Sequence, residues 1–575
     1  MFPPDTLTDH IHGKKLMTSD NRQIGRSAWQ DLLVLTVLIS LFFCFMIGNR
    51  ALSVPDEGRY VEIPREMVAT GDYLTPRLNY VKYFEKPVLF YWLEAFSIRL
   101  FGLNEFTLRL WPALFALFGC LAVYAAGARL FGRRSGLIAA VVLATSLLYY
   151  GLSRAIILDM PVAVLLTAAL LSFLLGTHEV PGLRRRLYLW SFYAFSALAV
   201  LTKGLIGVLI PGMVIAAWIV LLGEWRVLKT MYLPSGLALF MLIAAPWHIM
   251  VGRANPEFFY FYFYQEHFLR YLTKMHSRYQ PAWFFAPVVL LGLFPWSAFL
   301  VQAVKHSLPA SWRERHEHRD TLFLLLWAGL VFLFFSASSS KLVPYILPVF
   351  PPLALLIGRY LSAAWDSRDY PGVRAGYHIF LAASLLLAGA SLAVPFFAAP
   401  SDVEKLGLYR YVFAFTLAAG AVSAWALARL RGFQPAMIAL VATSMLFLME
   451  VNAAAPRVDA KSVKSLASAL KPLLKDCDEV ASFEEYYQDL PVYLERRITV
   501  VDWRSELDFG AAVEDTRSWM TDSVTFWKRW QGPSTMYVVM ETDKYDILRN
   551  DPRFKLFPVA RTRRNILLSN REVRQ

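Results

Sequence analysis

Long apolar runs follow one another along most of this chain and limit what it can fold into. A membrane-spanning helix needs about 20 mostly apolar residues. By that criterion the sequence holds about thirteen candidate spans, at residues 32–49, 107–129, 136–152, 160–176, 187–202, 204–222, 233–251, 282–303, 320–336, 343–363, 377–398, 407–428 and 433–450. The chain is 57% hydrophobic and only 18% charged, which is too apolar for a water-soluble enzyme. We therefore predict a polytopic α-helical membrane protein.

Arginine and lysine residues gather in every second connection between these runs. The richest groups are Arg129/Arg133/Arg134, Arg184–Arg186, Arg226/Lys229, Lys305/Arg313/Arg315/Arg319, Arg359/Arg368/Arg374 and Arg429/Arg431. Because cytoplasmic loops carry the excess of Lys and Arg, these connections and the basic tail 1–31 are expected inside, which puts the loops 50–106 and 252–281 and the C-terminal region outside. The net charge of +14 has the same explanation, so we expect no nucleic-acid binding.

The chain is expected to have three parts: a cytoplasmic tail (1–31), a transmembrane domain (32–455) and an outer α/β domain (456–575). In the last part, the patterns predict a helix at Ser462–Lys475, strands at Glu479–Phe483, Val492–Val501 and Met536–Glu541, and a strand pair within Lys555–Ser569. In the first outer loop, Val88–Phe101 is apolar but too short to span. We predict that it and Val61–Thr70 are interfacial helices.

The most polar stretch of the transmembrane part lies in this first outer loop. It begins with Pro55-Asp56-Glu57-Gly58-Arg59-Tyr60 and ends with Lys82-Tyr83-Phe84-Glu85-Lys86-Pro87. Charged groups are expensive inside a membrane, so a dense polar site at its edge suggests function. Taken alone, Asp56 and Glu57 are equally compatible with a plain helix end at the surface.

Other outer loops contribute groups of the same kind. These are Arg154 and Asp159 in the second outer loop, Lys203 in the third, Glu266, His267 and Arg270 in the fourth, and Lys341 and Tyr345 in the fifth. Cations can grip phosphate oxygens, Arg as a fork and Lys as a point charge. Tyrosines such as Tyr60, Tyr83 and Tyr345 can stack on a sugar and donate hydrogen bonds, although an aromatic belt at the membrane interface is the alternative.

Two residues are candidates for a divalent metal, with zinc as the first choice. Glu85 and His267 carry suitable ligand atoms, and Glu266 adds a second carboxylate beside His267. The spacing matches no established ligand motif. The metal is therefore a prediction from residue types alone.

Seven segments in this order resemble one known family. They are Pro55–Tyr60, Tyr83–Pro87 with Tyr91-Trp92, Arg154 through Leu158-Asp159-Met160-Pro161, Thr202-Lys203-Gly204, Pro246-Trp247, Glu266–Tyr271 and Lys341–Pro348. The chain resembles the bacterial aminoarabinose transferases, relatives of the protein O-mannosyltransferases in the GT-C class of membrane glycosyltransferases. The resemblance covers the membrane part and extends to the small C-terminal domain.

The resemblance implies transfer of 4-amino-4-deoxy-L-arabinose from undecaprenyl phosphate to a phosphate of lipid A, at the periplasmic face of the bacterial inner membrane. It also implies polymyxin resistance, entry of both lipid substrates from the bilayer, and a monomer. Lys86 and Arg270, supported by Lys203 or Arg59, would hold the charge that grows on the departing phosphate. Asp56, or else Asp159, would orient the acceptor or stabilise positive charge at the sugar.

Further polar groups of these segments are then expected to bind substrate. They are Glu57, Arg59, Tyr60, Tyr83, Arg154, Lys203, Lys341 and Tyr345. Two alternatives stay open. A protein O-mannosyltransferase would use similar donors but would need a true base for its Ser or Thr acceptor. A transporter would place charged sites at the bilayer midplane and show internal repeats, and we find no repeat in this sequence.

Overall fold

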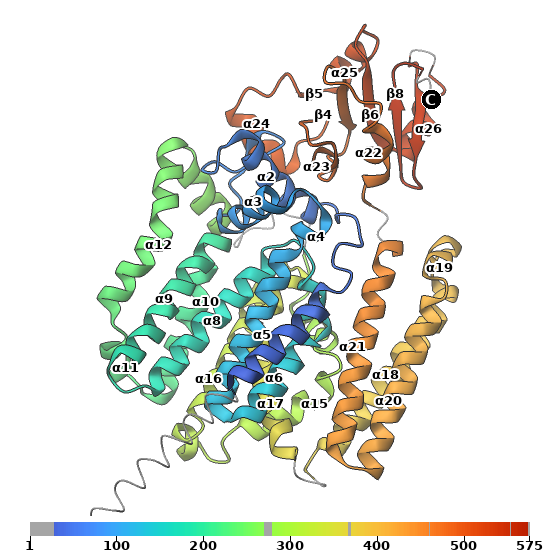
Figure 1. Cartoon of the computed structure of the whole chain (residues 1–575). Helices are drawn as coiled ribbons and strands as arrows, with labels where there is room; N and C mark the ends of the chain where they lie inside the picture. Colours follow the sequence, from blue (N-terminus) through green and yellow to red (C-terminus); the bar gives the residue numbers. More distant parts are fainter. Residues whose placement is uncertain (1–27, 270–278, 366–369, 459–460, 552–553, 573–575) are drawn as a thin grey trace, which may run out of the picture.

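The fold is a large helix bundle with an α/β domain at one end (Figure 1). The computed structural model describes residues 28–269, 279–365, 370–458, 461–551 and 554–572. The polar loop between the first two apolar helices lies where the bundle meets the α/β domain, as the positions of α2, α3 and α4 show (Figure 1). This arrangement puts the candidate site at one end of the bundle.

Eight helices of the described residues are long and apolar enough to cross a membrane, or nine if one bent pair counts as a span. They are α5 (Leu110–Phe131), preceded by α4 (Glu105–Leu108), α8 (Asp159–His178), α12 (Leu233–Ala254), α16 (Arg319–Ala337), α17 (Phe350–Ala364) with the 3-10 turn η4 (Val343–Val349), α18 (Val373–Phe397), α20 (Tyr409–Leu430) and α21 (Phe433–Val458). The structure thus confirms a polytopic helical protein.

The other predicted spans also coincide with helical segments, but the count of thirteen is not confirmed. The helix Ala28–Cys44 and α10 (Ile206–Leu222) are apolar but shorter. The range 187–202 corresponds to α9 (Leu183–Lys203), which carries several charges in its first turn. A short or charged helix can be part of the bundle without meeting a length-and-hydropathy criterion.

Two predicted spans are wrong as single helices. Residues 136–152 form α6 (Arg133–Ala144) and α7 (Leu147–Leu152), separated where the hydroxyls of Thr145 and Ser146 donate to the carbonyls of Val141 and Val142. Such side-chain bonds compete with the helical ladder. Residues 282–303 form α14 (Phe285–Gly292) and α15 (Ser297–Ser307), bent by 105°, where Pro295 has no N–H to continue the first helix.

The first outer loop contains the two expected helices and a small hairpin. The first helix, α2 (Asp56–Thr70), begins five residues earlier than predicted and ends at Gly71, whose φ of 75° suits glycine. Asp56 and Glu57 lie in its first turn, where the helix dipole favours carboxylates. The strands β1 (Arg77–Leu78) and β2 (Val81–Lys82) follow, and α3 (Leu89–Phe101) matches the predicted apolar helix.

The C-terminal domain is built on a six-stranded mixed sheet with the order β5-β4-β3-β6-β8-β7. Its elements are α22 (Lys464–Leu470), β3 (Glu479–Phe483), α23 (Leu490–Leu494), β4 (Thr499–Val501), η5 (Ser505–Leu507), α24 (Asp508–Val513), β5 (Met520–Thr521), α25 (Ser523–Trp530), β6 (Met536–Glu541), α26 (Thr542–Leu548), β7 (Phe557–Arg561) and β8 (Asn565–Ser569). Strands β5, β4, β3 and β6 are parallel to one another, and β8 is antiparallel to both of its neighbours, β6 and β7. The predicted strand at Val492–Val501 is wrong in its first half, because Pro491 suits the first turn of a helix.

Alternate residues of this sheet belong to two different cores. Val480 and Val539 are part of the hydrophobic cluster that runs through the helix bundle. Their chain neighbours Ala481 and Val538 pack with Phe526 in a separate core on the other face. Since successive side chains of a strand point to opposite faces, one face of the sheet covers the bundle side and the other carries its own helices.

The α/β domain is fastened to the polar loop by direct contacts. The side chain of Asn79 donates to the carbonyl of Ile498 over 3.0 Å and accepts from its N–H over 3.1 Å. The N–H of Leu52 donates to the hydroxyl of Tyr493 over 2.9 Å. Gly58 of α2 approaches Asp489 so closely that a Cβ would lie 2.7 Å from its backbone nitrogen. The polar loop is therefore held against the C-terminal domain at several points along its length.

Candidate active site

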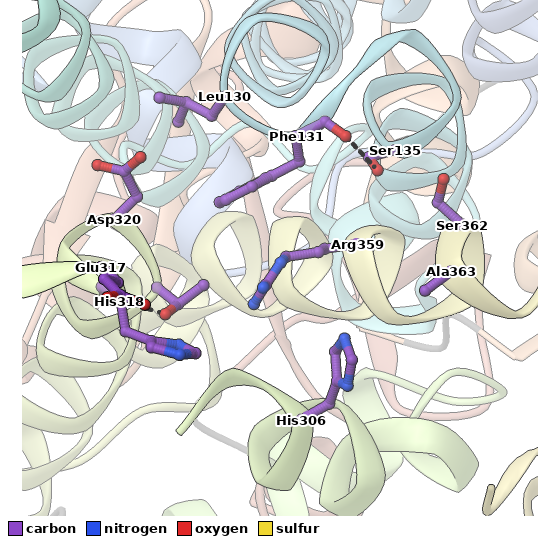
Figure 2. A pocket seen from close by; sticks show the side chains of 11 residues that line it. Leu130, Phe131, Ser135, His306, Glu317, His318, Asp320, Arg359, Ser362 and Ala363 are labelled. Carbon is purple, nitrogen blue, oxygen red and sulfur yellow. Dashed lines mark hydrogen bonds between the residues drawn. The ribbon is translucent and has the colours of Figure 1, made fainter. Parts of the chain in front are cut away.

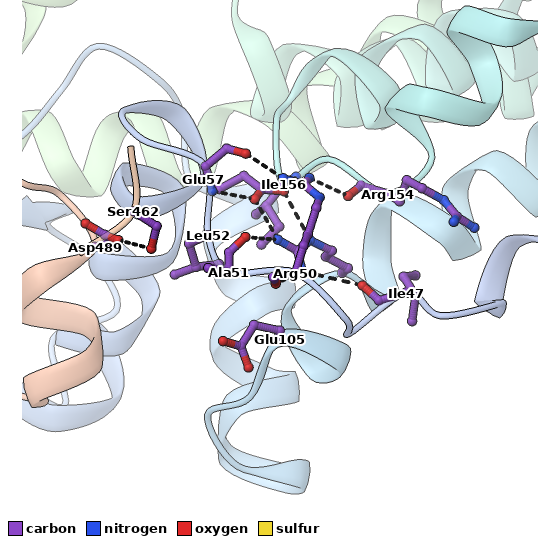
Figure 3. Close-up of polar contacts among 12 residues, drawn as sticks. Ile47, Arg50, Ala51, Leu52, Glu57, Glu105, Arg154, Ile156, Ser462 and Asp489 are labelled. Atoms are coloured by element: carbon purple, nitrogen blue, oxygen red, sulfur yellow. Dashed lines mark hydrogen bonds and ion pairs between the residues drawn. The ribbon is translucent and has the colours of Figure 1, made fainter. Parts of the chain in front are cut away.

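Glu57 is the centre of a buried ion network at the start of α2 (Figure 3). The two carboxylate oxygens accept from Arg109 over 2.7 and 3.2 Å, and one accepts from Arg50 over 2.8 Å. The N–H groups of Ser53 and Ile156 donate to the same carboxylate over 2.8 and 3.1 Å. Burial alone would raise the pKa of Glu57, but Arg109 and Arg50 hold it below its usual value.

Arg109 extends this network into the loop after the first helix. Its side chain is completely buried and donates to the carbonyls of Ile47, Arg50 and Ala51 over 3.4, 2.8 and 2.9 Å. Together, Glu57 and Arg109 fix the path of residues 47–57. These contacts give Glu57 a role in the scaffold, and its contact with substrate stays a prediction.

Two cations of the predicted set, Arg154 and Lys341, also bind the protein's own backbone, as Arg109 does. Arg154 donates to the carbonyls of Phe43 and Phe45 at the end of the first helix, over 2.6 and 3.2 Å. The amine of Lys341 donates to the carbonyls of Gln280, over 2.9 Å, and Ser338. Both side chains are buried, so their contacts are those of structural cations, and their binding of substrate is untested.

Asp56 lies beside Glu57 in the sequence and in very different surroundings. Its side chain is 49% exposed, and one carboxylate oxygen lies 3.8 Å from Nη1 of Arg59. Arg59 also forms an ion pair with Glu506 of the C-terminal domain. Burial alone would lower the pKa of Arg59, but the adjacent Tyr83 and Glu506 raise it above its usual value. Arg59 therefore stays charged next to an open carboxylate.

Three tyrosines, Tyr60, Tyr83 and Tyr91, lie near Arg59 and form one wall of the site. The rings of Tyr60 and Tyr91 are 6.3 Å apart, and Tyr83 lies close enough to both for electrostatic interaction. Burial raises the pKa of all three hydroxyls, which remain protonated at neutral pH. The hydroxyls of Tyr83 and Tyr91 are buried without a hydrogen-bond partner among the described residues, which is unusual for native proteins.

Lys86 connects this wall to the fourth outer loop. Its amine donates to the carbonyl of Glu85 over 2.7 Å and lies 3.9 Å from a carboxylate oxygen of Glu266. Glu266 lies in the π-helix η1 (Tyr260–Leu269). Glu85 interacts electrostatically with Arg59 and Tyr60. Segments about 180 residues apart in the sequence thus share one site, a proximity that only folding can create.

Asp159 and Lys203 bring the second and third outer loops to the same place. Nζ of Lys203 donates to a carboxylate oxygen of Asp159 over 2.5 Å, and it lies over the ring of Tyr345, 4.6 Å from its centroid. Both Asp159 and Asp56 interact electrostatically with Tyr60. The two acidic residues therefore flank one tyrosine.

The predicted residues thus converge from five outer loops. The cluster comprises Asp56, Arg59, Tyr60, Tyr83, Glu85, Lys86, Asp159, Lys203, Glu266 and Tyr345. Such an arrangement of cations, carboxylates and neutral tyrosines can bind a phosphorylated sugar. The catalytic or binding role of each residue remains a prediction.

Part of the predicted set lies outside the described residues. These are Arg270 and the side chain of His267. Within the described part of the chain, no group of three or more His, Cys, Asp or Glu side chains could hold a metal ion. Because one of the two predicted ligands is not described, the metal stays a prediction.

The sequence reasoning missed residues that act through distant partners. Arg50, Arg109 and Glu506 were not selected, and Tyr91 was noted only as part of a motif. The one usable signal was an arginine, Arg109, at the very start of an apolar run. A charge there needs a buried partner or a route to water.

Two family models match separate parts of this chain. Residues 85–250 match the one described as "Dolichyl-phosphate-mannose-protein mannosyltransferase", and residues 466–570 match the one described as "Aminoarabinose transferase C-terminal domain". The helix bundle and the polar site at its end, together with these matches, define a membrane glycosyltransferase of the GT-C class.

Similar proteins make the assignment narrower. A protein of Pectobacterium carotovorum subsp. carotovorum is 32% identical over 540 residues, covering 90% of this chain and 94% of its own, and one of Erwinia tasmaniensis is 31% identical, covering 84% and 88%. A crystal structure of ArnT from Cupriavidus metallidurans bound to undecaprenyl phosphate has a TM-score of 0.83 at 29% identity and covers 94% of this chain and 98% of that one. The chain belongs to the undecaprenyl phosphate-α-4-amino-4-deoxy-L-arabinose arabinosyl transferase family.

Proposed function

We propose that this protein transfers 4-amino-4-deoxy-L-arabinose from undecaprenyl phosphate to a phosphate group of lipid A, on the periplasmic side of the bacterial inner membrane. Its family membership supports the donor and the sugar. The observation that carries the proposal for the site is the convergence, at one end of the bundle, of Asp56 and Lys86 from the first outer loop with Asp159 from the second and Glu266 from the fourth. Lipid A as acceptor, the membrane and its face follow from the family resemblance and the charge pattern of the loops.

Cleavage of the donor requires positively charged side chains that are fixed in place beside the departing phosphate. When the bond between the sugar's anomeric carbon and the phosphate oxygen breaks, the electron pair stays with the departing lipid phosphate. Lys86 and Lys203 are both largely shielded from water, with side chains 16% exposed. Fixed charges in a partly dehydrated site stabilise such a charge more strongly than water does. Arg59, and Arg270 outside the described residues, would support them.

Asp56 is the carboxylate best placed to act on the acceptor or the sugar. Its side chain is 49% exposed, so a substrate can reach it, whereas Asp159 is held by Lys203. A phosphate monoester has a second pKa of about 6, and an acceptor phosphate is therefore largely anionic at neutral pH. It needs little help from a base. Asp56 would position the acceptor and stabilise positive charge developing at the anomeric carbon.

The test is transfer in vitro with the purified full-length protein. Undecaprenyl-phosphate aminoarabinose and lipid A are supplied in detergent, and lipid A is analysed by mass spectrometry for the added pentosamine. The product is expected with the wild-type protein and absent without donor. A protein acceptor that gains sugar while lipid A stays unmodified would instead support the O-mannosyltransferase-like alternative.

The same assay decides whether a metal contributes. Glu85 and His267 would be the ligands of a divalent ion such as zinc, and Glu266 lies near Lys86 at the same site. Such an ion would supply further positive charge for a phosphate. If it is required, a chelator abolishes transfer and added zinc restores it. Full activity after exhaustive chelation contradicts the metal prediction and leaves the glycosyltransferase proposal intact.

A further inference from the structure

A polar cavity lies at the end of the bundle opposite the α/β domain. It has a volume of about 550 Å³ and lies among the ends of α5, α15 and α17 and the start of α16, which are low in Figure 1 while the α/β domain is at the top. Arg359, His306 and His318 line it together with Phe131 and Asp320 (Figure 2). None of these residues belongs to the cluster around Asp56.

Arg359 is the residue of this cavity whose charge is least compensated by the protein. It is the one charged residue of α17, and its Nη1 atom is buried without a hydrogen-bond partner among the described residues. The guanidinium lies 5.5 Å from the centroid of the Phe131 ring. A cation–π contact alone is weak compensation for a shielded charge, which normally has a hydrogen-bonded partner.

Asp320 is close enough to interact electrostatically with Arg359, but no carboxylate of the described residues forms a hydrogen bond or ion pair with it. A carboxylate oxygen of Asp320 is bonded to Nε2 of His178 over 2.8 Å and lies 3.9 Å from Arg319. Glu317 is exposed at the rim. In Figure 2 the Asp320 side chain lies beyond Phe131, away from the guanidinium end of Arg359. Among the described residues, the cavity thus contains a cation with spare donors and no carboxylate bonded to it.

The side chains around Arg359 suit an anion with several oxygens. His306 and His318 extend toward the guanidinium from two other elements (Figure 2), and imidazole N–H groups are hydrogen-bond donors in both protonation states. Arginine binds phosphate oxygens in a forked arrangement. Basic pockets between membrane helices are known to hold acidic lipid headgroups.

We propose that the cavity around Arg359, His306 and His318 is a phosphate-binding site, separate from the active site. Its ligand is a phosphate group, carried by an anionic phospholipid headgroup or free in solution. Arg359 supplies the charge, and the two histidines supply further donors. The site does not depend on the proposed glycosyl transfer, and its failure would leave that proposal untouched.

The test uses the full-length protein in detergent. In one arm, inorganic phosphate is titrated at constant ionic strength against chloride, and the thermal midpoint is followed. In the other, native mass spectrometry measures retention of phosphatidylglycerol against phosphatidylethanolamine. The variant is Arg359→Gln. The matched control is Arg431→Gln, which removes an exposed arginine just after α20 that does not line the cavity.

The wild type and Arg431→Gln are expected to bind a phosphate ligand in a saturable way, and Arg359→Gln about tenfold more weakly or worse. Retention of phosphatidylglycerol identifies the lipid headgroup as the source, and a response to inorganic phosphate alone identifies free phosphate. If Arg359→Gln does not fold, His306→Gln, an exposed position, carries the comparison. A wild type that responds to neither ligand, or equal losses in the Arg359 and Arg431 variants, would overturn the proposal.

Discussion

Two adjacent carboxylates at the start of α2 have opposite surroundings. Glu57 is 2% exposed and bonded to two arginines and two backbone N–H groups. Asp56 is 49% exposed, and its nearest cation, Arg59, is 3.8 Å away. A one-residue step around a helix turns the side chain by about 100°, so one carboxylate points into the protein and the other toward the cluster of predicted substrate groups.

The same contrast separates two groups of residues: the scaffold, whose side chains bind Glu57 or backbone carbonyls, and the cluster of predicted substrate groups around Asp56. On the scaffold side, Arg109 has its hydrogen bonds supplied by carbonyls and by Glu57. On the other side, the hydroxyls of Tyr83 and Tyr91 are buried without partners among the described residues. An unmade buried hydrogen bond costs about 1–3 kcal/mol. Saturated groups are thus expected to govern stability, and unsaturated or exposed ones to govern substrate handling.

The largest expected effect is on the stability of Glu57→Gln. The change removes the negative charge and leaves the buried Arg109 and the partly exposed Arg50 uncompensated, which is expected to lower the free energy of unfolding by about 3–5 kcal/mol. Thermal unfolding in detergent measures it. The matched control is Asp508→Asn, which removes one partner of an exposed ion pair, Asp508 and Arg504, whose charged atoms are 4.0 Å apart. This variant is expected to leave the thermal midpoint unchanged.

The turnover of the folded fraction of Glu57→Gln is the sharper half of this comparison. If Glu57 belongs to the scaffold, enzyme that is kept well below its thermal midpoint should turn over at close to the wild-type rate. A normal midpoint with lost turnover would place Glu57 among the substrate groups after all.

Asp56→Asn is expected to show the reverse. Its exposed side chain contributes little to stability, so the thermal midpoint should stay near that of the wild type. The kcat for transfer should fall on the order of 10²–10³-fold, the loss typical for removing one group that stabilises a transition state. Affinity for the undecaprenyl-phosphate sugar should be retained. Turnover at the wild-type rate would remove Asp56 from the mechanism.

The sequence predicted the positions of helices well because hydropathy is a local property. It failed within residues 136–152 and 282–303, where Thr145, Ser146 and Pro295 interrupt runs that remain apolar on average. It also failed at α23, where Pro491 lies in the first turn of a helix in a stretch rich in strand-forming residues. In each case the chemistry of one or two residues, the side-chain hydroxyls of Thr145 and Ser146 or a proline ring, outweighed the pattern of their neighbours.

For the site, residue types and their loops were predictable, but their division into scaffold and cluster was not. Asp56 and Glu57 look alike in the sequence. Their difference depends on Arg109, which is 52 positions away from Glu57 along the chain. The link between Arg59 and Glu506 crosses two domains. Pairings of this kind depend on tertiary structure, and no local propensity encodes them.

Two lysines extend the comparison to the other loops. Lys203→Gln removes the ion pair with Asp159 and the contact over Tyr345. If Lys203 binds the donor phosphate, KM for the donor should rise about tenfold, since loss of a charged hydrogen bond typically costs about 1.5–3 kcal/mol, with a smaller change in kcat. Steady-state kinetics with varied donor measures both.

Lys341→Gln is the matched control for Lys203→Gln. Its amine is bound to the carbonyls of Gln280 and Ser338, so the structure assigns its contacts to the scaffold. This variant should lower the thermal midpoint and leave KM for the donor unchanged. Equal changes in KM for both variants would contradict a division based on hydrogen-bond partners.

The smallest expected effect is a change in pH dependence at Glu94 of α3. This carboxyl is fully buried, and neither of its oxygens has a hydrogen-bond partner among the described residues. Burial, and then the nearby Glu57, raise its pKa well above the usual 4.5. Above pH 4.5 the unfolded chain gives up this proton while the folded protein keeps it, so the stability that Glu94 contributes is complete below that pH and declines as the pH rises.

Glu94→Gln removes this titration. The stability that Glu57 contributes depends on pH in the opposite direction. The thermal midpoint of Glu94→Gln relative to wild type should increase steadily from pH 4.5 upward, by a total on the order of 1–2 °C. Because Arg109 and Arg50 lower the pKa of Glu57 against the effect of its burial, its contribution is present above the unfolded pKa and is lost as the pH falls. The deficit of Glu57→Gln should therefore shrink in acid. Parallel pH profiles for the two variants would show that these buried carboxylates do not differ in charge state.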